Sequence, residues 1–221
     1  VGNRTTTSDN RLALRGTAAL TTGALTLSES GAGATVDLAD RATLAVTKDL
    51  LFRPAVEGTV ATLVATDDAV VTVAGFVRPN DRAASAARSE LVLGGRARLR
   101  TTASHDGPGG GGLAFGTLPG EHRDAVARLV VADDAVVETA ARTTVGQVSA
   151  ASNVIEVCGN GTFINTSSNG GLILGRGRGG RGYLVVRDNG TVRLAGPLTL
   201  SGNLKFGDNL GGAARMDILG G

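Results

Sequence analysis

Short stretches in which apolar residues alternate with polar or small residues recur along the whole chain. Each unit reads apolar-x-apolar, then polar or glycine residues, then alanine or glycine, then a second apolar-x-apolar stretch. Seven segments follow this pattern: RLALRGTAALTT, TVDLADRATLAV, TLVATDDAVVTV, ELVLGGRARLRT, RLVVADDAVVET, VIEVCGNGTFIN and YLVVRDNGTVRL. Alternation with period two and frequent β-branched residues predict β-strands, whereas a helix would need a sustained 3.6-residue pattern that the sequence lacks.

The small residue between the two stretches sets the length of the repeat. It falls at Ala18, Ala42, Ala69, Ala97, Ala135, Gly161 and Gly190, so that successive units are 24, 27, 28, 38, 26 and 29 residues apart. A third short apolar stretch follows in each unit, from Leu25/Leu27 in the first to Leu204/Phe206 in the last. Three strands per unit predict a right-handed parallel β-solenoid of about seven three-strand coils, with residues 1–221 forming a single domain.

Stacking of such coils explains which residue types share a column. Coils lie about 4.8 Å apart, so equivalent positions in neighbouring coils touch. We expect the small residues to line a tight corner and the inward Leu, Val and Ile side chains to form a core that no coil buries alone. Directly before the small residue, the charges alternate and end in two amides, an order that favours contacts between neighbouring coils: Arg41, Asp68, Arg96, Asp134, Asn160 and Asn189.

The composition excludes several classes of protein. The 34 glycines do not recur at every third position, which excludes collagen, and 42% of the residues are apolar and patterned, which argues against disorder. A formal net charge of +2 is too balanced to indicate a nucleic-acid partner. The sequence has no run of 18 apolar residues, so we expect no membrane insertion. Cys158 is the single cysteine and is interpreted as a small core or corner residue.

Candidate chemistry is sparse along the chain. Gly175–Gly180 satisfies the pattern GxGxxG, but the residues after it predict a strand rather than a helix, so we interpret the motif as a turn and expect no cofactor. Aspartates recur at one corner, where salt-bridged turns are favoured over a calcium ladder: Asp40, Asp67, Asp68, Asp133, Asp134 and Asp188. The sequence also lacks the usual nucleophile, phosphate-loop and zinc-protease motifs, so we expect no enzyme and no catalytic residues.

The longest repeat interval contains a glycine-rich insertion, about residues 103–124, which we expect to be exposed. Two histidines and two carboxylates flank it and offer a zinc alternative: His105, Asp106, Glu121 and His122. The long gap across flexible glycines makes an exposed excursion from the rod the favoured interpretation, so we expect no metal site.

The segment Leu172–Gly196, LILGRGRGGRGYLVVRDNGTVRLAG, resembles a repeat of bacterial surface proteins. It is similar to the G-x-G-x-G-x-L-x-V-x-x-G-x-V units of PEP-CTERM-type and autotransporter-passenger β-helices. The resemblance implies secretion to an extracellular or cell-surface location and a structural, adhesive or matrix role. It carries over no catalytic residues.

The two ends of a solenoid expose unpaired backbone and core side chains, and the sequence shows no amphipathic capping helix at either end. Either the chain is a piece of a longer rod, or another subunit completes its ends. The leading hypothesis takes the second interpretation: a homo-oligomeric or polymeric subunit of a bacterial surface fibre or layer that stacks end to end. Its candidate interface residues are Leu12 and Leu14 at one end and Met216, Ile218 and Leu219 at the other.

The alternative is an adhesin passenger segment that binds a glycan or a host surface through its loops. The densest basic spot of the chain, Arg176, Arg178 and Arg181, is the candidate contact for an acidic polysaccharide. A polysaccharide-degrading solenoid enzyme is a third and less favoured hypothesis, since the carboxylates fall mostly in predicted turns.

Overall fold

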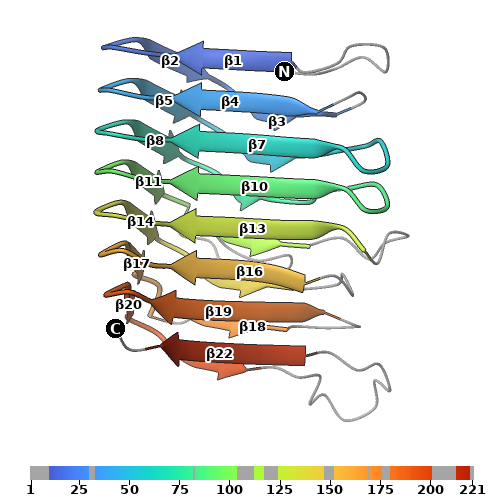
Figure 1. The fold of residues 1–221 in the computed structure, drawn as a ribbon, viewed down its shortest axis with the longest axis vertical. Coiled ribbons are helices and arrows are strands. Elements are labelled where there is room, and N and C mark those ends of the chain that lie inside the picture. The colour runs from blue at the N-terminus through green and yellow to red at the C-terminus, as the bar shows by residue number, and fades with distance from the viewer. Residues whose placement is uncertain are drawn as a thin grey trace.

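The computed structural model describes residues 10–29, 33–81, 83–103, 112–116, 124–146, 152–168, 170–175, 180–200 and 213–219. In these residues the chain forms strands and turns, without a helix, and winds around three parallel sheets (Figure 1). Viewed from the N-terminal end, the chain runs clockwise as it advances, so the coil is right-handed (Figure 1). The predicted all-β parallel β-solenoid is confirmed.

The first face of the coil, sheet A, has eight strands in register. Their order along the rod is β1 (Asn10–Leu14), β4 (Ala34–Leu38), β7 (Val60–Ala65), β10 (Arg88–Leu93), β13 (Val126–Val131), β16 (Ser152–Val157), β19 (Arg181–Arg187) and β22 (Ala213–Leu219). The strands β1 and β22 therefore form the two edges of sheet A, at opposite ends of the rod (Figure 1).

The other two faces have seven strands each. Sheet B consists of β2 (Ala19–Thr22), β5 (Thr43–Val46), β8 (Val70–Val73), β11 (Arg98–Thr101), β14 (Val136–Thr139), β17 (Thr162–Asn165) and β20 (Thr191–Leu194). Sheet C consists of β3 (Leu25–Leu27), β6 (Leu50–Phe52), β9 (Val77–Arg78), β12 (Leu113–Phe115), β15 (Thr143–Val145), β18 (Leu172–Leu174) and β21 (Leu198–Leu200). The described strands thus make seven three-strand coils, followed by β22.

The core fills the space between the three sheets. Because side chains of a strand alternate between its two faces, every second residue points inward. The largest fully buried side chains include Phe52 and Phe115 from sheet C and Phe163 from sheet B, among many leucines. These residues belong to one continuous apolar cluster, as expected when each coil is buried by its neighbours.

The predicted column of small residues lies at the corner between sheets A and B. The amide of the small residue donates to the carbonyl three residues earlier, as Ala135 does to Ala132 at 3.1 Å. Turns of the first five coils contain one residue of positive φ, such as Asp133 at 56°, whereas the turn of coil six has two, Gly159 and Asn160. A Cβ on Gly161 would lie 2.2 Å from the carbonyl oxygen of Val131, which explains the change from alanine to glycine.

Two sequence expectations about sheet C need adjustment. The third strand of the seventh coil is Leu198–Leu200, paired with β18, rather than the predicted Leu204/Phe206, which lie outside the described residues. Leu198 follows Gly190 by eight residues, the same interval that separates Ala42 from Leu50. A strand that begins at Leu198 rather than at Leu204 therefore keeps the spacing found in the second coil. β12 confirms the predicted third stretch Leu113/Phe115 and is fully buried in sheet C, so this part of the predicted insertion of about residues 103–124 is not an exposed loop.

Candidate interaction site at the ends of the coil

Sheet A carries two columns of inward-facing side chains from one edge to the other. The first column is Leu12, Val36, Leu63, Leu91, Leu129, Ile155, Leu184 and Met216, and the second is Leu14, Leu38, Ala65, Leu93, Val131, Val157, Val186 and Ile218. Both inward-facing columns are therefore apolar in all eight strands, including the two edge strands.

The exposure of these side chains depends on where their strand lies. Leu93, in the middle of the sheet, has no exposed surface, whereas Met216 is 36% and Ile218 70% exposed at the C-terminal edge. At the other edge, Leu12 and Leu14 pack against the core but remain half-buried. The residue type stays apolar along the columns, but among the described strands β1 and β22 have a neighbour on one side only, and this accounts for the exposure.

Other apolar residues widen the C-terminal end. Leu198 in sheet C is 38% exposed, and Val192 and Leu194 in sheet B are half-buried. Leu219 differs from Met216 and Ile218, because it pairs with Arg187 in the outward-facing register of sheet A and is 56% exposed there. The structure thus places the predicted interface residues Leu12 and Leu14 at one end of the rod and Met216 and Ile218 at the other. It places Leu219 on the outer face.

A cluster of charges lies on the outer face at the N-terminal edge. Arg11 of β1 and Arg15, which directly follows β1, both donate to the carboxylate of Asp37 on the neighbouring β4. Arg15 also donates to the carbonyl oxygen of Asp37 at 3.0 Å. The hydrogen bond from Arg15 lowers the pKa of Asp37 and that from Arg11 adds to it, so that together they outweigh the opposing effect of burial.

A second cluster of the same kind lies further along the same face. Glu156 of β16 accepts from Arg128 of β13 on one side and from Arg187 of β19 on the other. Two nitrogens of Arg187, Nε and Nη2, lie 2.9 and 2.7 Å from Oε1 of Glu156. Burial alone would raise the pKa of Glu156, but the bonds from the two arginines outweigh it and lower that pKa.

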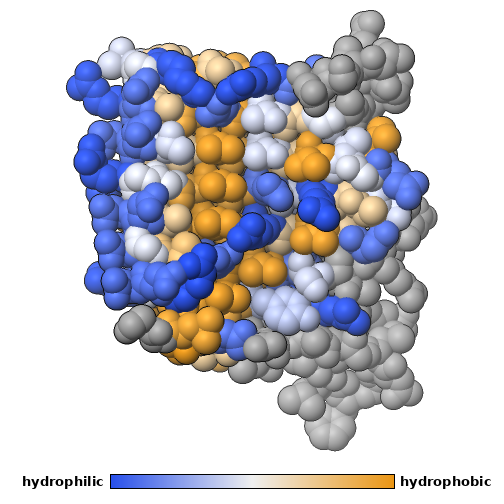
Figure 2. All heavy atoms as spheres, in the orientation of Figure 1, coloured by the Kyte–Doolittle hydropathy of each residue, from blue (hydrophilic) through white to orange (hydrophobic). Residues whose placement is uncertain are grey.

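The two acids stand in one outward-facing row of sheet A. The row is Ala13, Asp37, Val64, Val92, Val130, Glu156, Val185 and Asp217. Figure 2 shows an apolar stripe along this face, where the register places the three successive valines. The row begins between Arg11 and Arg15 at the N-terminal edge and ends in Asp217 on β22.

Three of the recurring aspartates of the A–B corner accept hydrogen bonds from backbone amides. The carboxylates of Asp40, Asp67 and Asp133 accept from Gly16 N, Asp40 N and Gly95 N at 2.8, 3.2 and 3.1 Å. Each bond links one turn to the same turn of the coil before it. Within the part of the chain that the structure describes, no group of three or more His, Cys, Asp or Glu is arranged to hold a metal. The sequence signal was that the same turn position holds either aspartate or glycine in each coil, and this residue has a positive φ.

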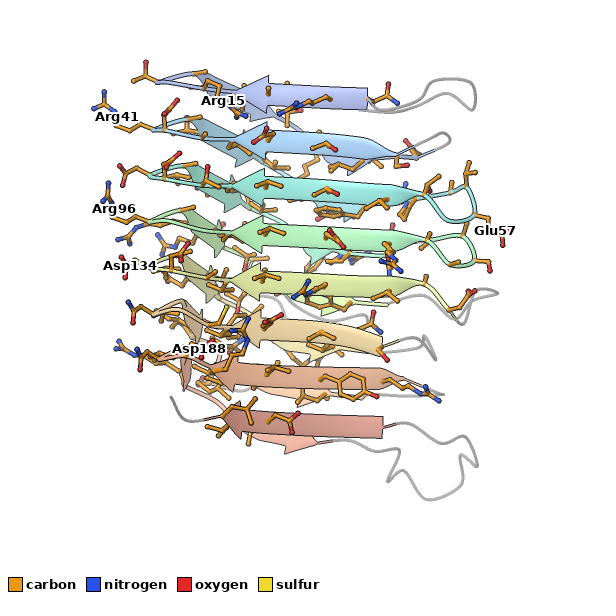
Figure 3. The ribbon with its side chains drawn as sticks, in the orientation of Figure 1. Arg15, Arg41, Glu57, Arg96, Asp134 and Asp188 are labelled. Atoms are coloured by element: carbon orange, nitrogen blue, oxygen red, sulfur yellow. The ribbon has the colours of Figure 1, made fainter. Side chains whose placement is uncertain are left out.

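The predicted alternation of charge at the same corner yields one ion pair. Figure 3 shows Arg41, Arg96, Asp134 and Asp188 along this edge of the rod. Arg96 donates through Nε and Nη2 to the two oxygens of Asp68, at 2.7 and 2.8 Å. Both side chains are well exposed, so this contact contributes little to the stability of the coil.

The remaining candidates give no further site. Gly175–Gly180 leads into β19, so the prediction that a strand follows the glycine motif is confirmed. Arg181 begins β19 and is exposed, and its carbonyl oxygen accepts from Asn153. Cys158 is buried, and burial raises the pKa of its thiol. The other predicted contacts lie outside the described residues: Arg176, Arg178, His105, Asp106, Glu121 and His122.

Comparisons with family models, with curated proteins and with solved structures found no match for this chain. A search of the described residues for a helix with the length and apolar character needed to cross a bilayer found none. The geometry of the two ends is therefore the observation from which a function can be argued.

Proposed function

We propose that this chain is a non-enzymatic structural protein of a bacterial surface, a β-solenoid subunit that assembles head to tail. In the assembly, β1 of one copy adds in parallel to β22 of the next. The observation that carries the proposal is the match between the two edges of sheet A. Met216 and Ile218 at one edge continue the columns that begin with Leu12 and Leu14 at the other.

Both physical terms of strand addition favour this contact. An edge strand offers unpaired N–H and C=O groups that another strand can satisfy. Burying exposed apolar side chains stabilises the contact by about 25 cal/mol per Å² of apolar surface removed from water. The two edges are different surfaces, so the contact is heterologous. Such a contact does not close on itself when repeated by translation along a rod, and it produces a fibre.

The unequal strand count of the sheets distinguishes two junctions. Sheets B and C have one described strand fewer than sheet A, so a copy that pairs with β22 leaves one strand position open in each of them. A junction flush on all three sheets would instead place β1, β2 and β3 on β19, β20 and β21, and β22 would have to leave. We propose the first junction, because it needs no strand to be displaced.

A structural rather than catalytic role is supported by how the enclosed carboxylates are used. Asp37 and Glu156 each bind two arginines, and Asp81 binds Arg53 at 2.7 Å. Carboxylates engaged by arginines are poor general bases, and the pKa values of Asp37 and Glu156 are held low in this way. The extracellular location rests on the resemblance of Leu172–Gly196 to bacterial surface repeats.

Sedimentation velocity over a wide concentration range, followed by electron microscopy, tests the proposal. The chain is expected to form rods whose length grows with concentration, and Ile218→Asp is expected to abolish them. Val60→Asp is the matched control, because Val60 is an exposed apolar residue of sheet A, 37% accessible, away from both edges. A chain that stays monomeric at every soluble concentration would contradict the proposal.

Removal of residues 213–221 separates the two junctions. Loss of rods is expected if β22 forms the contact. Longer or more abundant rods would contradict the proposed junction and indicate the flush one, in which β22 acts as a removable cap.

A further inference from the structure

We infer that Asp217 of one copy binds Arg11 and Arg15 of the next copy, and that this contact fixes the register of the stack. The inference rests on the proposed head-to-tail function and names the charged residues that recognise the partner, which is a second copy of this chain. Its basis is an arrangement of one acid and two arginines that sheet A already contains twice.

In both existing clusters the acid occupies the same outward-facing row. Asp37 and Glu156 stand in that row, and the arginines stand in the two flanking rows, one strand away. Arg11 and Arg128 belong to the flanking row on one side. On the other side, the ladder carries the row from Arg15, which follows Leu14, to Arg187. An acid in the middle row of the neighbouring strand is therefore within reach of both arginines.

Asp217 completes the pattern when a second copy is added. Asp217 belongs to the middle row, so adding β1 beside β22 in the continued register places Asp217 opposite Ala13. Arg11 and Arg15 then flank Asp217 from one side as they already flank Asp37 from the other. An arginine has five N–H donors and can bind two carboxylates, so the contact with Asp37 is kept.

The apolar columns favour the same register. Continued pairing sets Leu12 opposite Met216 and Leu14 opposite Ile218. A shift by one residue would turn both leucines to the outer face. A shift by two would pair one apolar residue with Asn10 or Gly16 and would leave Asp217 opposite an arginine instead of between two. One register therefore satisfies both apolar columns and the charge cluster.

A charge-swap experiment tests the inference. Asp217→Arg is expected to raise the critical concentration for rods at least tenfold, and so is the double change Arg11→Glu with Arg15→Glu. An equimolar mixture of the two variants is expected to form rods again, because in a rod where the two variants alternate every junction joins opposite charges. Asp134→Arg makes the same charge change at an exposed corner and is expected to behave as the unmodified chain.

The double variant also alters the contact with Asp37, so its folding is checked by circular dichroism and thermal melting. Arg11→Glu alone replaces it in the mixture if it fails to fold, since Arg11 is the more exposed of the two at 61%. Rods of the unmodified chain are further expected to shorten at high salt, which screens exposed charges.

The outcomes separate this inference from the proposed function. If the unmodified chain forms no rods, the head-to-tail function is wrong. If it forms rods and Asp217→Arg leaves the critical concentration unchanged, or the mixture fails to restore rods while both variants are folded, stacking occurs in another register and this inference is overturned.

Discussion

The middle and the C-terminal edge of sheet A contain the same kinds of residue, yet only the middle is a core. Leu93 and Ile218 stand in one inward-facing column, but Leu93 is fully buried and Ile218 is 70% exposed. The strand of Leu93 has neighbours on both sides, whereas β22 has β19 on one side and no other strand among the described residues. In a solenoid, burial is therefore a property of the stack, and an edge differs from the core by its missing neighbour.

The charged clusters show the same contrast. Glu156 lies inside the sheet and is bound by arginines from the strands on both sides, Arg128 and Arg187. Asp37 lies next to the N-terminal edge, and both of its arginines come from the same side, Arg11 from the edge strand β1 and Arg15 from the residue that follows it. The inner cluster is complete within one copy, and the outer one has a further side on which a second acid can bind.

The largest expected effect tests whether the middle and the edge differ in energy as they do in exposure. Leu93→Ala is expected to lower the free energy of unfolding by about 2–5 kcal/mol, because it leaves a cavity between packed neighbours. Ile218→Ala is expected to change it by less than about 0.5 kcal/mol in the monomer, as exposed residues do. Urea unfolding monitored by circular dichroism, below the concentration of assembly, measures both.

Equal losses for Leu93→Ala and Ile218→Ala would break the comparison, because they would mean that the edge is as enclosed as the middle in solution. Leu198→Ala is a second edge variant, in sheet C, and is expected to follow Ile218→Ala.

A second prediction concerns the corner of the inner coils. Gly161→Ala is expected to destabilise the chain by about 1–3 kcal/mol, since the new Cβ would overlap the carbonyl oxygen of Val131 in the neighbouring coil. Ala135→Gly, at the equivalent position one coil earlier, removes a methyl group and is expected to cost about 1 kcal/mol or less. Thermal melting measures the two changes. If both variants melt like the unmodified chain, the corner is not the close contact that the structure shows.

The repeat itself could be predicted from the sequence because stacking imposes one residue type on each column. The series of small residues from Ala18 to Gly190 located the corner between sheets A and B. The alternation of apolar and polar residues located the strands on either side of that corner. The third strands were harder to place, since three-residue stretches such as Leu198–Leu200 are too short for alternation to identify. The position of each of these strands is fixed instead by its pairing with the neighbouring strand of sheet C.

The candidate site was only partly visible in the sequence for a related reason. Leu12, Leu14, Met216 and Ile218 follow from the inward columns, but Asp217 gains meaning only when the register places it in the row of Asp37 and Glu156. Residues of one row come from successive coils, so their alignment depends on the exact length of each coil. The sequence shows that length only approximately, because the turns between the sheets vary.

A third prediction compares the inner and outer charge clusters. Glu156→Gln is expected to lower the free energy of unfolding by about 1–2 kcal/mol at neutral pH, as loss of hydrogen bonds to charged groups does. Asp37→Asn is expected to have a smaller effect, because Arg11 and Arg15 lie at the edge of the coil, where their side chains are exposed to water. Urea titrations at neutral pH measure both.

The pH dependence of the third prediction has a defined sign. The pKa of Glu156 is lowered in the folded chain, so its contribution is present above the ordinary glutamate pKa of about 4.3 and is lost as the pH falls. The difference between the unmodified chain and Glu156→Gln should therefore shrink in acid. A difference that grows as the pH falls would contradict the lowered pKa.

The smallest expected effect shows that a place in the middle of the rod is not sufficient. Asp68 and Arg96 belong to inner coils, but their side chains are 42% and 71% exposed at the corner. Although the bond to Arg96 lowers the pKa of Asp68, water and salt screen the pair, and Asp68→Asn is expected to leave the urea midpoint unchanged within error. A clear shift, which disappears when Arg96→Gln is added, would mean that charges stacked on the surface of this coil are coupled as strongly as enclosed ones. The difference between middle and edge would then come from the presence of neighbouring coils alone, and the exclusion of water from a contact would not be needed to explain it.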